Sequence, residues 1–148
     1  SRCCIYTLAP VSQEECEREV LRLVPHAQEV PALCRAFGGR IGSVVRVLTD
    51  ESQQKFLETA RHMMRAAAEN REYSLLAAAA AYEKDRPAAQ RLCAVLAQLC
   101  AAELFSGETL APGMAARMVK ACGEAHRQLS ANVNAKAVWS VFAAAVCA

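Results

Sequence analysis

The chain has 148 residues, of which 54% are hydrophobic and only 5% are aromatic. This length and apolar content suffice for one medium-sized domain or two small ones with a substantial core. A net charge of +2, with lysines and arginines scattered along the chain, does not by itself indicate binding to nucleic acid or to a membrane. Abundant alanine with few aromatic residues favours closely packed helices over sheets.

The eight cysteines do not follow the spacing of a disulfide framework or of a zinc site, because no Cys-x-x-Cys pair occurs. Cys3 and Cys4 are adjacent. Five of the others lie on expected apolar helical faces: Cys34, Cys93, Cys100, Cys122 and Cys147. We therefore expect reduced, buried thiols and a cytoplasmic location. We expect no signal peptide and no membrane-spanning run of about 18 or more apolar residues.

The first ten residues read as the end of a domain that the sequence does not include. Residues 3–8 (CCIYTL) favour a strand, which Pro10 ends. A single strand leaves its backbone groups without partners, and no other segment favours a strand. We therefore expect residues 1–10 to be the last strand of a missing sheet. The chain begins at Ser1 without an initiator methionine, and we expect it to be a piece of a longer protein.

Two short helices are predicted next. Ser12 and Glu15 have the spacing of a capping box, which predicts a helix that runs to about Leu23. Pro25 closes this helix. A second helix begins at residues 29–31, because proline is tolerated in the first turn of a helix.

The stretch 33–48 (LCRAFGGRIGSVVRVL) predicts a tight helical corner. Helical spacing of apolar residues runs into Gly38-Gly39 and resumes almost at once from Ile41. Two glycines permit positive φ angles, so the chain can leave one helix and enter the next within a few residues. Residues 11–49 are therefore expected to form a small three-helix bundle.

Residues 49–52 are polar and supply a helix N-cap, so we place a domain boundary there. Met63 and Met64 lie on the apolar stripe of the next helix, and core packing is the favoured interpretation of both. Residues 50–148 are predicted to form a five-helix domain. Its helices are expected at about residues 52–68, 71–84, 87–105, 112–129 and 135–146.

The last predicted helix is apolar almost all round. A helix with so little polar surface is buried on several sides. It is therefore either the central rod of the second domain or part of a subunit interface. The interface candidates on this helix are Val138, Trp139 and Phe142.

No catalytic set is recognisable in the sequence. His26, His62 and His126 have no cysteine or carboxylate at a suggestive spacing, and no phosphate-binding loop motif occurs. We expect this polypeptide not to be an enzyme, and we expect it to bind no cofactor or metal of its own.

The N-terminal motifs nevertheless resemble a known family. Ser1-Arg2-Cys3, a strand, Leu8-Ala-Pro10-Val-Ser12 and a capped helix resemble the pattern that closes the ATPase domain of clamp-loader subunits. The resemblance implies that Arg2 is an arginine finger, which reaches ATP bound on the neighbouring subunit. Such fingers accelerate nucleotide hydrolysis by about 10³–10⁵-fold in other hydrolases.

Two further segments extend the resemblance. Glycine at position 42, in Gly39-Arg-Ile-Gly42, stands where ATP-binding subunits have a sensor arginine; this pattern is similar to the delta-prime type, which does not use ATP itself. Arg40 is a possible substitute for that arginine. Asn132-Val-Asn134-Ala-Lys136 before an apolar helix looks like the last collar helix of the family.

The chain thus resembles the C-terminal region of bacterial DNA polymerase III clamp-loader subunits of delta-prime type. The resemblance implies the end of an ATPase domain at residues 1–10, a lid at 11–49 and a collar at 50–148. It also implies assembly with gamma/tau and delta subunits, which together load the sliding clamp on primed DNA. No membrane is involved.

Two alternatives stay open at this point. One is an ATP-binding loader subunit of gamma/tau type, against which Gly42 argues. The other is a free-standing helical adaptor that binds a partner helix in an alanine-lined groove.

Overall fold

The structure is a computed structural model that describes residue 7, residue 9 and residues 11–147. These residues form eight helices and no strand, so the all-α prediction is confirmed. The strand predicted at residues 3–8 lies outside the described residues except for Thr7, which belongs to no helix or strand. The helices are α1 (Gln13–Leu23), α2 (Val30–Ala36), α3 (Ile41–Thr49), α4 (Glu51–Ala68), α5 (Glu72–Ala80), α6 (Arg86–Ser106), α7 (Pro112–Ser130) and α8 (Ala135–Cys147).

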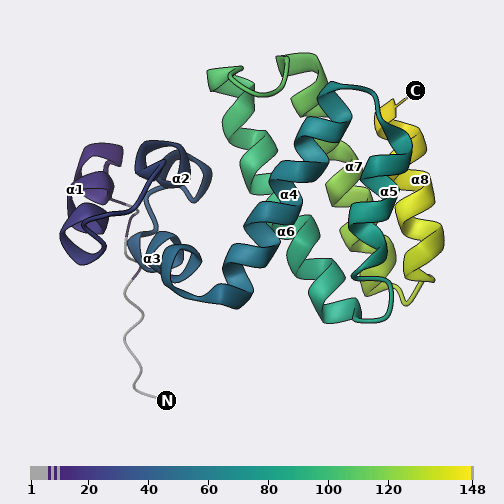
Figure 1. Cartoon of the computed structure of the whole chain (residues 1–148), viewed down its shortest axis with the longest axis horizontal. Helices are drawn as coiled ribbons and strands as arrows, with labels where there is room; N and C mark the ends of the chain where they lie inside the picture. Colours follow the sequence, from purple (N-terminus) through teal and green to yellow (C-terminus); the bar gives the residue numbers. More distant parts are fainter. Residues whose placement is uncertain (1–6, 8, 10, 148) are drawn as a thin grey trace.

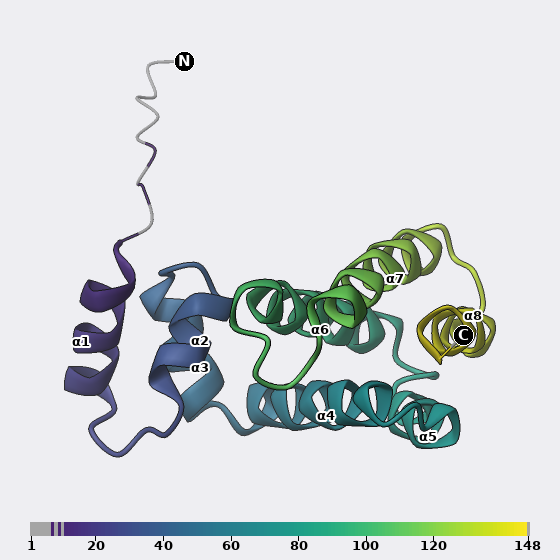
Figure 2. The same cartoon turned by 90° about the horizontal axis from the view of Figure 1, so that it is seen from above.

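The helices gather in two groups (Figure 1). Helices α1, α2 and α3 contact one another at one end of the molecule, and α4 to α8 make up the larger part. The main contacts that join the groups are those of α3 with α4 and of α2 with α6 (Figure 2). Because the buried residues of both groups form one continuous cluster, the division into a lid and a collar domain stays a prediction.

Helices α1 and α4 begin at side-chain caps in the places that the sequence indicated. The Ser12 hydroxyl accepts a hydrogen bond from the Glu15 backbone N–H at 3.3 Å, and the Ser12 backbone N–H donates to the Glu15 carboxylate at 3.2 Å. Asp50 ends α3 and caps α4, since its carboxylate accepts from the Ser52 backbone N–H at 2.8 Å. A single residue therefore joins α3 to α4.

The α5 helix is shorter than predicted. It ends at Ala80 rather than near Lys84, and residues 81–84 form turns. In these turns Tyr82 packs against Phe56 of α4, with ring centroids 5.4 Å apart, and its hydroxyl lies 3.1 Å from the hydroxyl of Thr59. These contacts with α4 stabilise the turns in which the chain reverses direction. If α5 continued to Lys84, these turns could not form.

The glycine corner forms as predicted. Gly38 and Gly39 have φ angles of 57° and 71°, a left-handed conformation that favours glycine. Gly39 also has no room for a side chain, because an added Cβ would lie 2.3 Å from the carbonyl oxygen of Val11. The corner is therefore packed directly against the chain that leads into α1.

The α6 helix occupies the middle of the larger group and packs against α2, α4 and α7. No membrane-spanning run was predicted, yet α6 is long and apolar enough to cross a membrane by length and composition. In this fold one side of α6 faces the core: Ala89, Leu92, Cys93, Val95, Leu96, Leu99 and Cys100 are buried. Leu104 and Phe105, near its end, are exposed.

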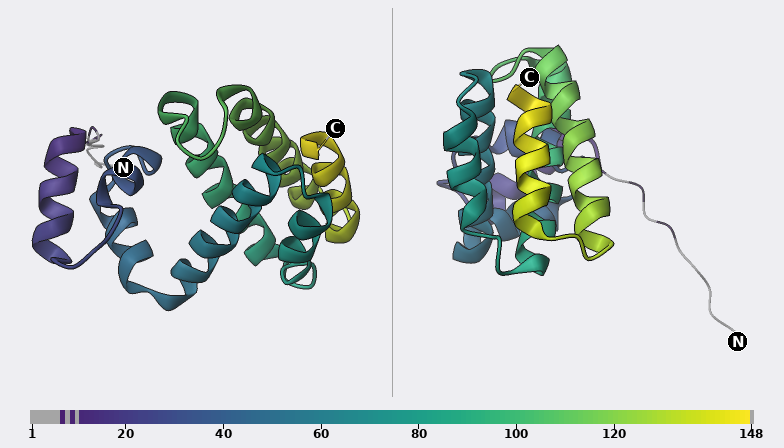
Figure 3. Two further views of the ribbon diagram at one scale, coloured as in Figure 1. Left: turned by 45° about the horizontal axis from the view of Figure 1, so that its top comes forward. Right: turned by 90° about the vertical axis from the view of Figure 1, so that its right-hand side faces the viewer.

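The last helix is not a central rod. It lies at the end of the molecule, where it packs against α7 and α5 (Figure 3). Its inward side is buried, and its other side, which includes Val141, is exposed.

Substitution of the corner glycines is expected to destabilise the fold to different degrees. Gly38→Ala adds only backbone strain, about 1–2 kcal/mol, because its Cβ would meet nothing within 4 Å. Gly39→Ala adds the clash with the carbonyl oxygen of Val11, so it should lower the free energy of unfolding by clearly more than Gly38→Ala does. Gly42→Ala is the control, since it lies in helix α3 with open space and should be neutral or stabilising by up to about 1 kcal/mol. Urea unfolding checks the order, and equal losses at positions 38 and 39 would contradict it.

Acid is expected to weaken the start of α4. Hydrogen bonds from the Ser52 hydroxyl and from the Ser52 backbone N–H lower the pKa of Asp50. A lowered pKa in the folded state contributes stability above the unfolded pKa of about 3.9, and this stability is lost as the pH falls further. Asp50→Asn keeps an oxygen acceptor but cannot titrate. Its unfolding free energy should therefore fall less than that of the wild type between pH 5 and pH 3, and parallel pH profiles would contradict this.

Candidate functional site

The proposed arginine finger, Arg2, lies outside the described residues. The role that the resemblance gives it therefore stays a prediction.

Arg40 and Gly42 both lie on the surface at the start of α3. Arg40 is the N-cap residue of α3, its side chain caps no backbone group, and it has no ion pair among the described residues. Gly42 has open space where a side chain would point, so packing does not explain why glycine occupies this position. The corner therefore leaves both positions accessible to solvent.

The three interface candidates of the last helix are buried inside the chain, and their part in a subunit interface stays a prediction. Val138, Trp139 and Phe142 are at most 2% exposed, and the rings of Trp139 and Phe142 form an edge-to-face pair with centroids 5.7 Å apart. These residues attach α8 to the bundle. The one buried side-chain polar atom without a hydrogen-bond partner in the described chain is Nε1 of Trp139.

The exposed sides of α5 and α8 form a surface with very little charge, which we call the end face. Each of the two helices carries one charged residue, Glu72 in α5 and Lys136 in α8, both in the first turn. The helices run antiparallel, so these charges lie at opposite ends of the face (Figure 1). The exposed residues between them are uncharged, and most are small: Tyr73, Ala77, Ala80, Ala137, Ser140, Val141, Ala144 and Ala145.

A cleft of about 680 Å³ lies where the two groups of helices meet. It is lined by α2, α4, α6 and the α6–α7 loop, and the buried side chains of Leu33, Met64 and Leu99 contribute its apolar surface. Charged side chains of both signs also line it. This cleft was not predicted from the sequence. One signal for it was the row of Glu58, Arg61 and Arg65, which runs beside the buried stripe of α4.

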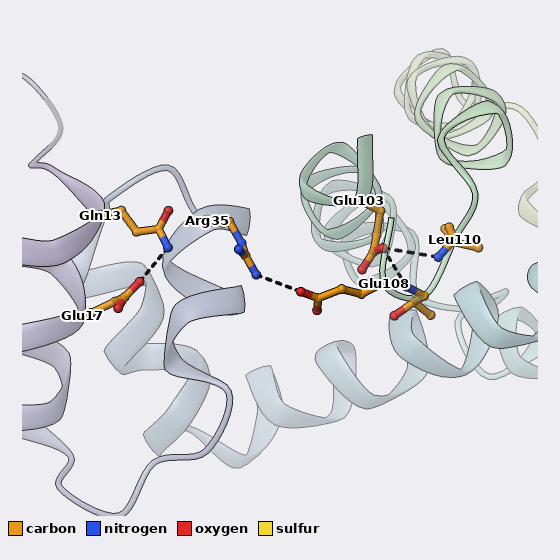
Figure 4. A network of polar contacts seen from close by, with 7 residues as sticks. Gln13, Glu17, Arg35, Glu103, Glu108 and Leu110 are labelled. Atoms are coloured by element: carbon orange, nitrogen blue, oxygen red, sulfur yellow. Dashed lines mark hydrogen bonds and ion pairs between the residues drawn. The ribbon is translucent and has the colours of Figure 1, made fainter. Parts of the chain in front are cut away.

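Two ion pairs cross the junction beside this cleft. Glu29, the N-cap residue of α2, pairs with Arg61 of α4. Arg35, in the last turn of α2, pairs with Glu108 of the α6–α7 loop at 3.5 Å (Figure 4). The short helix α2 is thus attached to the larger group at both of its ends.

The α6–α7 loop is shaped by a carboxylate. Glu103 accepts hydrogen bonds from the backbone N–H groups of Thr109, at 2.9 Å, and of Leu110, at 3.3 Å. Gly107 ends α6 in a left-handed conformation with φ 62°. These contacts hold the loop in the position from which Glu108 reaches Arg35 (Figure 4).

The cysteines within residues 11–147 behave as apolar residues that are buried or partly buried, as predicted. Cys16, Cys34, Cys93, Cys100 and Cys122 are free and buried, and Cys147 is free and partly buried. Burial raises the pKa of the Cys93 and Cys100 thiols to about 12. Burial also raises the pKa of Cys34 to about 12, with a contribution from a hydrogen bond to Cys16. Thiols with so high a pKa are poor nucleophiles near neutral pH.

Within residues 11–147 no group of three or more histidine, cysteine or acidic side chains is placed to hold a metal ion. Met63 and Met64 are core residues, as predicted, and His62 is exposed. Comparisons with family models, with curated proteins and with solved structures find no match for this chain.

The buried thiols are expected to resist alkylation in the folded protein. At pH 8 a thiol with a pKa of about 12 is ionised in about one molecule in ten thousand, and burial blocks access as well. Mass mapping after iodoacetamide treatment should therefore show little modification of Cys93 and Cys100 until guanidinium unfolds the chain, and more of Cys147. Modification of Cys93 in the folded protein at the rate of a free thiol would contradict the packing described.

Proposed function

We propose that the chain is the lid and collar region of a bacterial DNA polymerase III clamp-loader subunit of delta-prime type. In this proposal it performs no catalysis itself. It assembles with gamma/tau and delta subunits in the cytoplasm, and the complete assembly loads the sliding clamp on primed DNA. Arg2 would act on ATP bound by a neighbour, in the role that the resemblance gives it.

The observation that carries the proposal is the end face of α5 and α8. The centres of subunit interfaces are depleted in charged residues, and the end face has none between Glu72 and Lys136. Small side chains such as Ala77 and Ala144 let a neighbouring helix approach closely. Tyr73 is 84% exposed and Val141 is 54% exposed, and both would lose contact with water in such an interface.

The glycine corner supports the delta-prime type over the gamma/tau type. Gly42 is exposed and has room for a side chain, so the fold tolerates an arginine there yet the chain has none. A subunit that lacks this arginine has one fewer group with which to contact a bound nucleotide.

The proposal predicts that a charge on the end face weakens assembly. Val141→Glu should reduce the association of the subunit that contains this chain with purified gamma/tau and delta by at least about tenfold, because it leaves an unpaired carboxylate in an apolar interface. Leu21→Glu on α1 is a matched control, since Leu21 is exposed to a similar extent at the other end of the molecule. Analytical ultracentrifugation measures the association.

Three outcomes separate the alternatives. Loss of association with Val141→Glu alone agrees with the proposal. No association of the wild-type subunit with gamma/tau or delta would favour the free-standing adaptor. Saturable ATP binding by the subunit alone would favour the gamma/tau type, since a delta-prime subunit should not respond to nucleotide.

A further inference from the structure

We infer that α2 and the α6–α7 loop form an ionic latch across the cleft. The pairs Glu29–Arg61 and Arg35–Glu108 hold α2 closed against α4 and α6, and α2 loosens when these charges are screened or engaged by a partner. This inference concerns the internal motion of the chain, and it does not depend on the proposed function.

The first half of the latch is at the start of α2. Glu29 occupies the N-cap position, where a side chain normally accepts a hydrogen bond from the first turn. Its carboxylate makes no such bond and pairs with Arg61 of α4 instead. Glu29 also has a left-handed backbone, with φ 59°, which non-glycine residues seldom adopt. The start of α2 is thus held by a contact with the larger group rather than by its own cap.

The second half is at the other end of α2. Arg35 lies in the last turn, where a cation also interacts favourably with the helix dipole, and it reaches Glu108 at 3.5 Å. Glu108 itself is held in place by the loop that Glu103 and Gly107 shape. The pair therefore joins the last turn of α2 to the α6–α7 loop.

The two ion pairs are weak enough for α2 to open and close reversibly. The Arg35 side chain is 37% exposed and that of Glu108 is 65% exposed, so water and salt screen their attraction. Exposed pairs of this kind shift an equilibrium by no more than about fivefold each. The cleft of about 680 Å³ beside them leaves α2 without continuous packing against α4. Along the chain, Asp50 is the one residue between α3 and α4, which also pack against each other.

Hydrogen exchange of the α2 backbone, followed by mass spectrometry on the whole chain, tests the latch. Glu108→Gln should speed exchange in residues 30–36 by about two- to fivefold, while exchange in α7 stays unchanged. Arg35→Gln should have the same effect. The double variant should exchange no faster than either single variant, because the same pair is lost in all three. Raising the salt from 0.05 M to 0.5 M should speed exchange in the wild type more than in Glu108→Gln.

Glu19→Gln provides the control, because it removes an ion pair with Arg22 that lies wholly on α1. Exchange in residues 30–36 should not change in this variant. Arg35 and Glu108 are exposed and Glu19 is partly exposed, so far-ultraviolet circular dichroism should confirm that each variant folds. Unchanged exchange in Glu108→Gln would overturn the inference. So would additive effects of the two substitutions, or an equal acceleration throughout the chain.

Discussion

The packing of α6 against three other helices is the constraint on which the rest of the structure depends. Leu92, Leu96 and Cys100 are fully buried on this helix, which contacts α4 and α7 on its long sides and α2 near the junction. A helix surrounded in this way leaves no central place for another apolar helix. The α8 helix is therefore displaced to the end of the bundle, beside α5, with one side buried and one side open to solvent.

The same arrangement separates two kinds of surface. Near the last turns of α6 the chain forms a cleft with charges of both signs, four of which form the two ion pairs at the ends of α2. At the end of the molecule away from α1, α5 and α8 form a face with almost no charge, which the described chain does not cover. Paired charges beside a cleft suit reversible movement, whereas an uncharged face of small residues suits a lasting contact. The proposed scaffold role and the latch thus draw on different parts of the fold.

Local features of the fold could be predicted from the sequence because they depend on neighbouring residues. The Ser12 cap, the Asp50 cap and the Gly38-Gly39 corner all formed where their spacing indicated. The end of α5 and the cleft could not be predicted, because they depend on contacts between distant segments, such as Tyr82 with Phe56 and Arg35 with Glu108. The burial of Trp139 inside the chain could not be predicted from composition. An apolar helix face indicates that the face is buried, but not which element buries it.

The central claim is that the end face of α5 and α8 is covered by a neighbouring loader subunit. A structure of the assembled loader that contains this chain, determined by electron cryomicroscopy, tests it most directly. The account predicts that side chains of an adjacent subunit cover Val141 and Ala144, while Trp139 keeps its place inside the chain. An assembled loader in which this face lies open to solvent, with its neighbours held elsewhere, would contradict the account.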